Sequence, residues 1–372
     1  MVVRSVRFSP LVTVCRGGDV SSAAGRAGRT QTGRSAILRL GKQSTLDVLC
    51  VGQCSMMAYT RESTAVIAQA SAQDSSAQGS SNTNELLIVG PGVLGSYLGK
   101  LWLDTHGAGT VVGQTNTTTN HEVLKSIGIS PRTGDDAQGV KAGQRFANVA
   151  YCAPPSGSED YPGDIAKALS YWDGSGNFIF TSSAGVYSIN DGSDCNESSP
   201  VNELGSNPRT DALLLAEKTV LEAGGCVMRL VGLYHRTRGP HTFFLKQGDV
   251  PRWGGYTVNM IHYEDAASIC KAVLVGQGSD TGIYRSEVFV GCDGTPVTFQ
   301  DMMHAIEESG VLPGHVEFTE KDGGDNKGKY MSNTATREQL QWSPKYSSVA
   351  AFFKQGAQDW YCRVQPTGMP HA

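Results

Sequence analysis

"LLIVGPGVLGSYLG" (86–99) is the stretch from which the fold of this sequence follows. Its first four residues form a short apolar run, typical of a buried strand, which ends at a glycine. From Leu94 onward, apolar side chains recur three and four positions apart as far as Trp102, the spacing of an amphipathic helix. The stretch therefore predicts a buried strand, a tight glycine turn and a helix, in that order.

The turn has the spacing Gly-x-Gly-x-x-Gly at Gly90, Gly92 and Gly95. Between a strand and a helix, the first glycine makes the turn, the second lets a pyrophosphate approach, and the third lets the helix pack closely. The phosphates would meet N–H groups at the helix N-terminus, around Val93 and Leu94, where the helix dipole favours anions. The pattern predicts a dinucleotide-binding loop, and the alternative is a glycine-rich turn without a ligand.

Strand and helix patterns alternate along the rest of the chain. Strands are predicted at 86–90, 110–113, 146–155, 177–183, 226–234 and 283–291, and helices at 93–104, 120–129, 161–172, 209–224, 264–276 and 298–310. Right-handed crossovers then give an α/β fold with a doubly wound parallel sheet of the Rossmann type. We assign the core of this fold to 86–235, and assign 236–365 to completing the sheet and to a small C-terminal cap on the substrate side of the ligand cleft.

The first 70 residues differ in charge from the rest. They carry nine Arg and Lys against three Asp and Glu, so their net charge is 9 − 3 = +6, and the whole chain at −4 leaves −4 − 6 = −10 for the remainder. A basic leader rich in Ser, Ala and Gly is typical of an organelle transit peptide. We expect 1–70 to direct the protein to the chloroplast stroma, with the mitochondrion as second choice and an untargeted tail as the alternative, and 71–85 to be a disordered linker.

Composition excludes several classes of protein. No run of about 18 apolar residues is present, which argues against a membrane span. The acidic body argues against RNA as a partner, because RNA affinity depends on neutralising phosphates with Lys and Arg. The nine cysteines form no CxxC and none has a histidine at zinc-binding spacing, so no metal site is expected.

The end of the second predicted strand bears on which nicotinamide cofactor is bound. NAD-binding folds usually place an Asp or Glu there to hold the ribose hydroxyls. The sequence reads GQTNTTTN (113–120), with no acid and no arginine to clamp a 2′-phosphate. Thr115 and Asn116 can hydrogen-bond a phosphate or a hydroxyl. Because no carboxylate repels the extra phosphate, the sequence favours NADP(H) over NAD(H).

Four further segments extend the pattern: FIFTSSAGVY (178–187), CVMRLVGLYHRTRGP (226–240), MIHYEDAA (260–267) and YMSNTATREQLQWSPKYSSVAAFF (330–353). Together with the glycine loop they resemble the extended or atypical short-chain dehydrogenase/reductases, in particular the NAD-dependent epimerase/dehydratase-like group. The resemblance covers about 86–360. It implies that Ser183 hydrogen-bonds a substrate oxygen, and that the cofactor lies against Ala153, Pro154 and Pro155, the two prolines on its adenine side.

The sequence departs from this family at the residues that transfer the proton. The family uses a Tyr and, four residues later, a Lys on one helix, where a Glu follows four residues after the Lys. Counting back from Glu217 puts Leu213 at the place of the Lys and Arg209 at that of the Tyr. Arginine stays charged at neutral pH and is a poor general acid. Arg209 is therefore a candidate to grip a carboxylate or phosphate of the substrate or cofactor, or it is a solvated helix-start residue.

Two functions remain open from the sequence. One is a plastid reductase or epimerase/dehydratase that acts on a small or sugar-type substrate without the usual Tyr/Lys pair. The other is a non-catalytic sensor of nicotinamide nucleotides, or a scaffold. His235 and His241, beyond a predicted strand end, lie where ligands of open α/β sheets bind.

Overall fold

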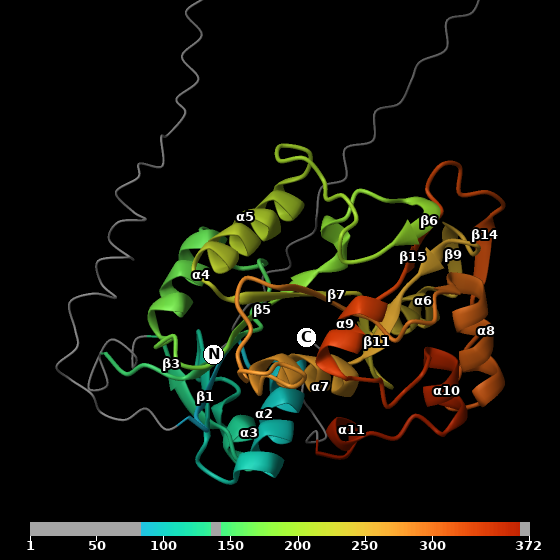
Figure 1. Cartoon of the computed structure of the whole chain (residues 1–372). Helices are drawn as coiled ribbons and strands as arrows, with labels where there is room; N and C mark the ends of the chain where they lie inside the picture. The colour runs from blue at the N-terminus through green and yellow to red at the C-terminus, as the bar shows by residue number, and fades with distance from the viewer. Residues whose placement is uncertain (1–82, 135–142, 365–372) are drawn as a thin grey trace, which may run out of the picture. The chain divides into compact units, whose positions relative to one another are not determined.

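The computed structural model describes residues 83–134 and 143–364 (Figure 1). The chain divides into two compact units, 1–73 and 74–372, and every described residue belongs to the second. The predicted transit peptide and nearly all of the predicted linker lie outside the described residues. Among the helices of the described ranges, none has the length and apolar character required to span a bilayer.

Seven parallel strands form the main sheet, in the order β12-β7-β5-β4-β1-β2-β3. They are β1 (Leu86–Val89), β2 (Val111–Thr115), β3 (Ser130–Thr133), β4 (Asn148–Tyr151), β5 (Phe178–Ser183), β7 (Cys226–Leu230) and β12 (Val288–Gly291). The chain moves outward from β1 to β3 and then resumes on the other side of β1 with β4. This reversal confirms the predicted doubly wound Rossmann sheet, in which ligands bind beyond the carboxyl ends of the two strands at the reversal.

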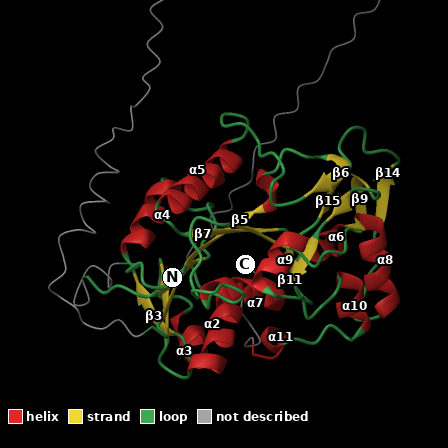
Figure 2. Cartoon of the chain, in the orientation of Figure 1, coloured by secondary structure: helices red, strands yellow, loops and turns green. Residues whose placement is uncertain are grey.

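Helices cover both faces of this sheet (Figures 1 and 2). One face carries α2 (Val93–His106), α3 (His121–Ser126) and α7 (Tyr263–Leu274), and the other carries α4 (Tyr161–Ser170) and α5 (Pro208–Glu222). Side chains alternate along each strand, so Leu86 and Ile88 pack with the first group of helices and Leu87 with the second. Because both faces are buried, the strands read as continuous apolar runs.

The remaining elements build a cap beside the carboxyl ends of β5 and β7. Its largest sheet has four strands in the order β13-β10-β15-β6, and two further pairs are β11 with β8 and β14 with β9. The strands are β6 (Asp191–Cys195), β8 (Gly232–Tyr234), β9 (Asp249–Trp253), β10 (Thr257–Val258), β11 (Met260–His262), β13 (Val297–Thr298), β14 (Glu317–Glu320) and β15 (Gly328–Met331). Its helices are η2 (Ala184–Val186), α6 (Pro240–Gln247), α8 (Phe299–Ser309) and α10 (Val349–Lys354), whereas α9 (Thr334–Leu340) and α11 (Trp360–Val364) pack against the Rossmann part.

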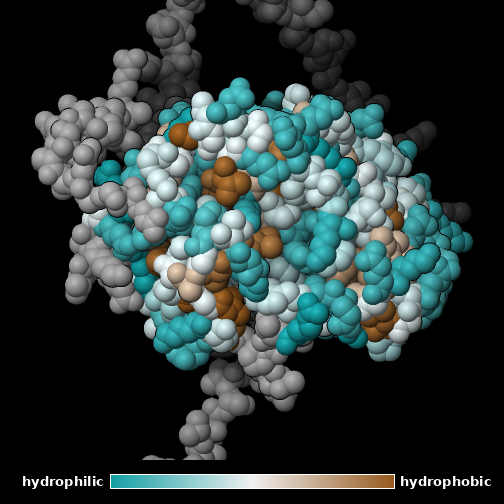
Figure 3. All heavy atoms as spheres, turned by 60° about the horizontal axis from the view of Figure 1, so that its bottom comes forward, coloured by the Kyte–Doolittle hydropathy of each residue, from teal (hydrophilic) through white to brown (hydrophobic). Residues whose placement is uncertain are grey.

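The end of the described chain returns to the Rossmann part. Asp359 Oδ2 lies 3.2 Å from His262 Nε2, and both side chains are completely buried. The Trp360 ring meets Tyr97 of α2 edge to face, with ring centroids 5.6 Å apart. Figure 3 views the molecule from the side of α2 and α3, where hydrophilic residues cover most of the surface and hydrophobic ones form small separate groups.

Several predicted boundaries were wrong. The single strand expected at 226–234 is two, because the chain leaves the main sheet at Val231 and β8 pairs with β11 instead. The strand expected at 283–291 begins only at Val288, after Ser286, whose φ of 54° is incompatible with a strand. The strands β3 and β6 and the helix α6 were not predicted.

A buried ion pair joins helix α5 to strands β5 and β7. Glu217 Oε2 lies 2.7 Å from Arg229 Nη2, and Glu217 Oε1 accepts a hydrogen bond of 2.5 Å from Ser182 Oγ. Glu217 is 3% exposed and Arg229 is 8% exposed. The guanidinium also lies over the Tyr187 ring, 4.8 Å from its centroid. The carboxylate thus holds two neighbouring strands and the helix that covers them in one arrangement.

Replacing Arg229 with Met should lower the free energy of unfolding by about 3–5 kcal/mol, because Glu217 would keep a buried charge without its partner. Urea unfolding followed by circular dichroism measures this loss. The control is Lys218→Met, which breaks the exposed Lys218–Glu222 pair (3.8 Å) and should cost less than about 1 kcal/mol. Equal losses in the two variants would show that the buried pair has no special structural role.

A second buried carboxyl lies where β12 meets the cap. Asp293 is 4% exposed, and its Oδ1 accepts a hydrogen bond of 2.8 Å from the Thr295 N–H. Within the described residues, Oδ2 has no hydrogen-bond partner. Burial raises the pKa of Asp293 from 3.8 to about 7, against the opposing effects of the Thr295 hydrogen bond and the Arg337 charge. In the folded protein the Asp293 carboxyl therefore stays mostly protonated up to about pH 7.

This shift predicts how stability depends on pH. The unfolded chain ionises Asp293 near pH 4 and the folded chain only near pH 7, so the free energy of unfolding should fall as pH rises between these values. Asp293→Asn removes the buried charge and keeps an oxygen for the Thr295 N–H. Its gain over the wild type should be larger at pH 8 than at pH 5, by up to about 2–3 kcal/mol, since each pKa unit corresponds to about 1.4 kcal/mol. Thermal unfolding at the two pH values tests this, and a gain that does not change with pH would contradict it.

Candidate functional site

The glycine loop lies at the reversal of strand order, between the carboxyl ends of β1 and β4. Gly90 has a φ of +77°, and a Cβ there would stand 2.6 Å from the Ala153 Cα, so only glycine fits. A Cβ on Gly95 would stand 2.9 Å from Ile88 Cγ2, which shows how closely α2 packs on β1. Gly90 and Gly95 thus have the local geometry that the sequence predicted, a tight turn and a close approach of helix to strand.

Gly92 differs from the other two glycines because it faces open space. It precedes α2 as its N-cap residue, and a Cβ on it would meet nothing within 4 Å. The first N–H groups of α2, including those of Val93 and Leu94, have no partner within the helix. Val93 is half-buried and Leu94 is buried, so their main chain rather than their side chains is available to a ligand.

The chain that leaves β4 lies opposite the glycine loop, across the crevice that a parallel sheet forms where its strand order reverses. The Cys152 N–H donates to the Val89 carbonyl (2.8 Å), and the Ala153 carbonyl accepts from the Tyr161 hydroxyl (2.8 Å). Ala153 and Pro155 are half-buried and Pro154 is exposed. Of the predicted cofactor residues on this loop, Ala153 lies directly against Gly90, and the two prolines follow it in the chain.

The end of β2 holds the residues predicted to meet the ribose or its phosphate. Asn116 is exposed, whereas the Thr115 hydroxyl lies 2.8 Å from His121 Nε2 and donates to the Thr117 carbonyl. Sequence analysis found no arginine here, yet β3 brings Arg132 beside Gln114, with Nε 3.0 Å from its Oε1. Arg132 is buried and its guanidinium lies over the Tyr171 and Phe146 rings. It packs inside the protein rather than extending over the crevice.

Ser183 ends β5 and lines a cavity next to this crevice. Its Oγ accepts a hydrogen bond of 3.1 Å from the Gly185 N–H, which leaves the hydroxyl proton free to point elsewhere. The neighbouring Ser182 points to the other face and binds Glu217. The alternation of a strand therefore separates a structural serine from one that faces the cavity.

Arg209 and Leu213 lie one turn apart on α5, and neither lines the cavity. Arg209 is exposed in the first turn, where its N–H donates to the Asn207 side chain (2.9 Å). Leu213 is 7% exposed and packs with Ala216 and Val186 in the core. The structure thus leaves Arg209 in solvent and gives Leu213 an ordinary packing role.

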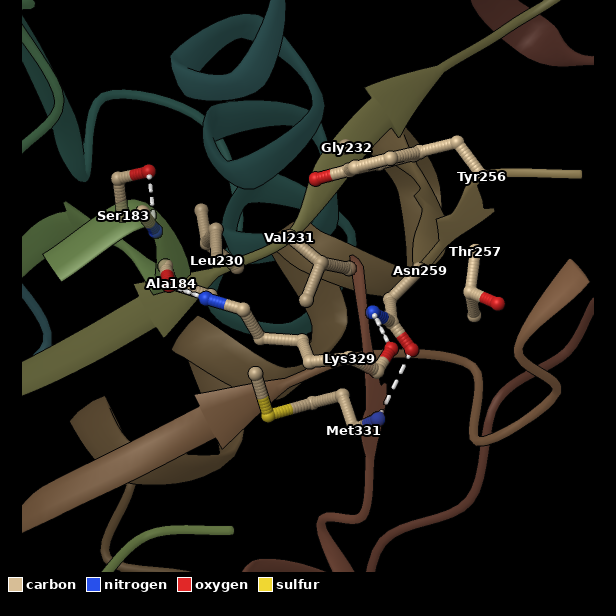
Figure 4. A pocket seen from close by; sticks show the side chains of 11 residues that line it. Ser183, Ala184, Leu230, Val231, Gly232, Tyr256, Thr257, Asn259, Lys329 and Met331 are labelled. Atoms are coloured by element: carbon tan, nitrogen blue, oxygen red, sulfur yellow. Dashed lines mark hydrogen bonds between the residues drawn. The ribbon is translucent and has the colours of Figure 1, made fainter. Parts of the chain in front are cut away.

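The cavity beside Ser183 has a volume of about 270 Å³ and is shown in Figure 4. It is lined by 183–185, 230–232, 256–257, 259, 329 and 331. The Rossmann part thus supplies one wall, and the cap supplies the other. Tyr256 and Lys329 are the ionisable residues among them, and burial raises the pKa of Tyr256, so its hydroxyl stays protonated at neutral pH.

His235 and His241, which the sequence placed near the expected ligand edge, are not protonated at neutral pH. Burial lowers the pKa of His235 to about 4 and that of His241 to about 4. Both side chains are buried, and His241 Nε2 lies 3.1 Å from the Arg236 carbonyl. They are neutral packing residues in the described fold.

Lys329, Tyr256 and Asn259 of the cavity were not predicted from the sequence. They come from β10, β15 and their flanks, which are short, polar strands with no apolar run. Lys329 contacts Ala184, which lies 145 positions earlier in the chain, and no local sequence pattern indicates such a contact. In the part of the chain that the structure describes, no cluster of His, Cys, Asp and Glu could hold a metal ion.

No protein-family model and no curated protein sequence matches this chain. Solved structures do share its fold. A conserved protein of unknown function from Silicibacter pomeroyi is 21% identical with a TM-score of 0.58, and the match covers 73% of this chain and 98% of the other. A UDP-glucose 4-epimerase from Thermotoga maritima, solved with UDP-glucose, is 15% identical (TM-score 0.57; 73% and 97% covered).

A third similar structure is a UDP-glucuronic acid 4-epimerase from Bacillus cereus in complex with NAD. It is 18% identical with a TM-score of 0.57, and the match covers 73% of this chain and 94% of that one. At these identities the likeness establishes the fold. The chain is an α/β protein with the Rossmann-type fold of NAD-dependent epimerases, as the resemblance in its sequence predicted.

Proposed function

We propose that this protein binds a nicotinamide dinucleotide in the crevice beyond β1 and β4, and acts as a reductase or epimerase/dehydratase on a small or sugar-type substrate. One observation carries the proposal: Gly92 leaves open space above the N-terminus of α2 at the reversal of strand order. A pyrophosphate fits there because the helix offers N–H donors and its dipole favours an anion. Ser183 and its cavity lie on the same edge of the sheet, beyond β5.

The bound dinucleotide would supply hydride transfer, and the chain's residues would hold and orient the reactants. The N–H groups of Val93 and Leu94 hold the pyrophosphate. Ser183 donates its hydroxyl proton to a substrate oxygen, since its Oγ already accepts from Gly185. Leu213 offers no cation for the nicotinamide ribose, so cofactor affinity is weaker than in family members that have lysine at this place.

A second candidate is a non-catalytic sensor or scaffold in the plastid. The exposed Arg209 and the buried Leu213 favour it, because neither can transfer a proton to a substrate in the cavity. A positioned acid or base typically contributes about 10²–10⁴-fold in rate. Two assays separate the candidates. NADPH oxidation with a panel of carbonyl compounds detects a reductase, and product analysis of nucleotide sugars incubated with protein and NAD(P)⁺ detects an epimerase or dehydratase, which returns the hydride and leaves no net change in the cofactor. A sensor binds the cofactor and gives neither signal.

Gly92→Asp should abolish dinucleotide binding while the protein stays folded. The φ of Gly92 is −73° and its Cβ position is open, so the aspartate fits, but its carboxylate would repel the pyrophosphate. Repulsion of this kind costs several kcal/mol, and we expect NADPH affinity to fall by about 100-fold or more in fluorescence titrations. Any NADPH oxidation should disappear with it.

The matched control is Ala350→Asp, in the first turn of α10 in the cap. Ala350 is exposed, and an acidic side chain is favoured in the first turn of a helix. This variant adds the same charge away from the glycine loop and from the end of β2, and should bind NADPH as the wild type does. Unchanged affinity in folded Gly92→Asp would reduce the glycine loop to a simple turn and refute the proposal.

We further propose that NADPH binds more tightly than NADH, by a modest factor. The end of β2 carries Gln114, Thr115 and Asn116 and no carboxylate, so nothing there repels a 2′-phosphate. Exposed Asn116 is the side chain left to hold the phosphate, since the Thr115 hydroxyl is engaged by His121. Parallel titrations of the full chain with the two cofactors measure the ratio, and equal affinity or a preference for NADH would refute the assignment.

A further inference from the structure

Lys329 projects from β15 into the cavity beside Ser183 (Figure 4). Its Nζ lies 3.2 Å from the Tyr187 carbonyl and 3.4 Å from the Ala184 carbonyl. The ammonium therefore ends next to the residue that follows Ser183, although the lysine belongs to the cap and the serine to the Rossmann sheet. Two main-chain carbonyls fix its position and leave a third N–H direction.

This cation has no carboxylate partner among the described residues: Lys329 is in none of their ion pairs, although its side chain is half-buried. The other groups near it are the Tyr187 ring, whose centroid is 6.0 Å away, and the Cys195 thiol. Burial raises the pKa of Cys195, so the thiol is neutral near pH 7 and does not balance the charge. A half-buried cation without a counter-ion is costly, and burial lowers the pKa of Lys329 accordingly.

The position of Lys329 is held by Asn259, which follows β10 in the cap and lies beside β15. Asn259 Nδ2 donates to the Lys329 carbonyl (2.9 Å), and Asn259 Oδ1 accepts from the Met331 N–H (3.0 Å). The amide thus binds the main chain of β15 on both sides of Tyr330. Because its side chain is used in this way, Asn259 is a positioning residue and not a ligand group.

The remaining polar groups define what the cavity accepts. Ser183, Tyr256 and Thr257 each carry a hydroxyl, and Lys329 offers the single positive charge. Neither arginine nor histidine occurs among the described residues that line the cavity, whereas phosphates are usually held by several cationic or N–H donors. A volume of about 270 Å³ is below that of sites for drug-sized ligands. One charge and a small volume match a small carboxylate better than a diphosphate.

We propose that this cavity is the substrate site and that it selects small carboxylates bearing a nearby carbonyl or hydroxyl oxygen, with Lys329 holding the carboxylate and Ser183 the second oxygen. The inference rests on the proposed function, because it names the substrate class of the same site. It places the substrate's charge on a lysine from the cap, not on helix α5.

The test uses the full chain with its lysines reductively methylated with ¹³C-formaldehyde, which preserves their charge. The NMR signal that disappears in Lys329→Arg identifies Lys329. Pyruvate should shift this signal to saturation, while pyruvamide, its neutral amide, should bind at least about 10-fold more weakly. Inorganic phosphate should also bind more weakly than pyruvate.

Variants then separate charge from fold. Lys329→Met should lose pyruvate binding, measured by saturation transfer to the pyruvate methyl group, and Lys329→Arg should retain part of it. The control is Lys327→Met, an exposed lysine just before β15 that does not line the cavity, which should bind pyruvate normally. If Lys329→Met does not fold, as judged by circular dichroism, Lys329→Gln takes its place.

Three results would overturn the inference: equal binding of pyruvate and pyruvamide, pyruvate binding that survives in folded Lys329→Met, or tighter binding of phosphate than of pyruvate. NADPH titration of the same samples keeps the two proposals apart. A wild type that binds pyruvate at Lys329 but not NADPH refutes the proposed function alone, and one that binds NADPH but shows no Lys329–pyruvate contact refutes this site alone.

Discussion

The close approach of Gly90 to Ala153 is the constraint on which the rest of the ligand edge depends. A Cβ at Gly90 would collide with the Ala153 main chain, and the φ of +77° would strain any other residue. The loops after β1 and β4 therefore meet at the reversal of strand order, where ligands of open α/β sheets bind. Gly92 can then expose the first turn of α2, and the Ala153–Pro155 loop faces it across the reversal of strand order.

Helix α5 has a structural role that does not depend on which side chains occupy positions 209 and 213. Glu217 binds Ser182 of β5 and Arg229 of β7, so the helix still fixes the strand end from which Ser183 faces the cavity. One turn earlier, Leu213 contributes only packing. The contacts that position Ser183 therefore come from Glu217, and the side chains of Arg209 and Leu213 contribute nothing to them.

Local signals in the sequence predicted the central sheet and the glycine loop, and long-range contacts explain what they did not predict. β1, β4 and β5 are buried on both faces, so each one shows an apolar run, and glycine is the only residue that fits at Gly90. β3, with the sequence SPRT, is an edge strand in which the one buried residue is Arg132, and its pattern resembles a loop. Lys329 comes to line the same cavity as Ser183 because β15 pairs with β6. No residue spacing within either segment indicates this pairing.

The two proposed ligand sites differ in which parts of the fold build them. The site proposed for the dinucleotide lies wholly in the Rossmann part, at the loops after β1, β2 and β4. The proposed carboxylate site needs both parts, since Ser183 comes from β5 and Lys329 from β15 of the cap. A disturbance of the cap, such as loss of the Asn259 bonds to β15, would therefore displace the cation without touching the glycine loop. The proposed cofactor site is thus complete without the cap, whereas a carboxylate held between Ser183 and Lys329 would stabilise the packing of the cap on the sheet, because it binds only the folded arrangement.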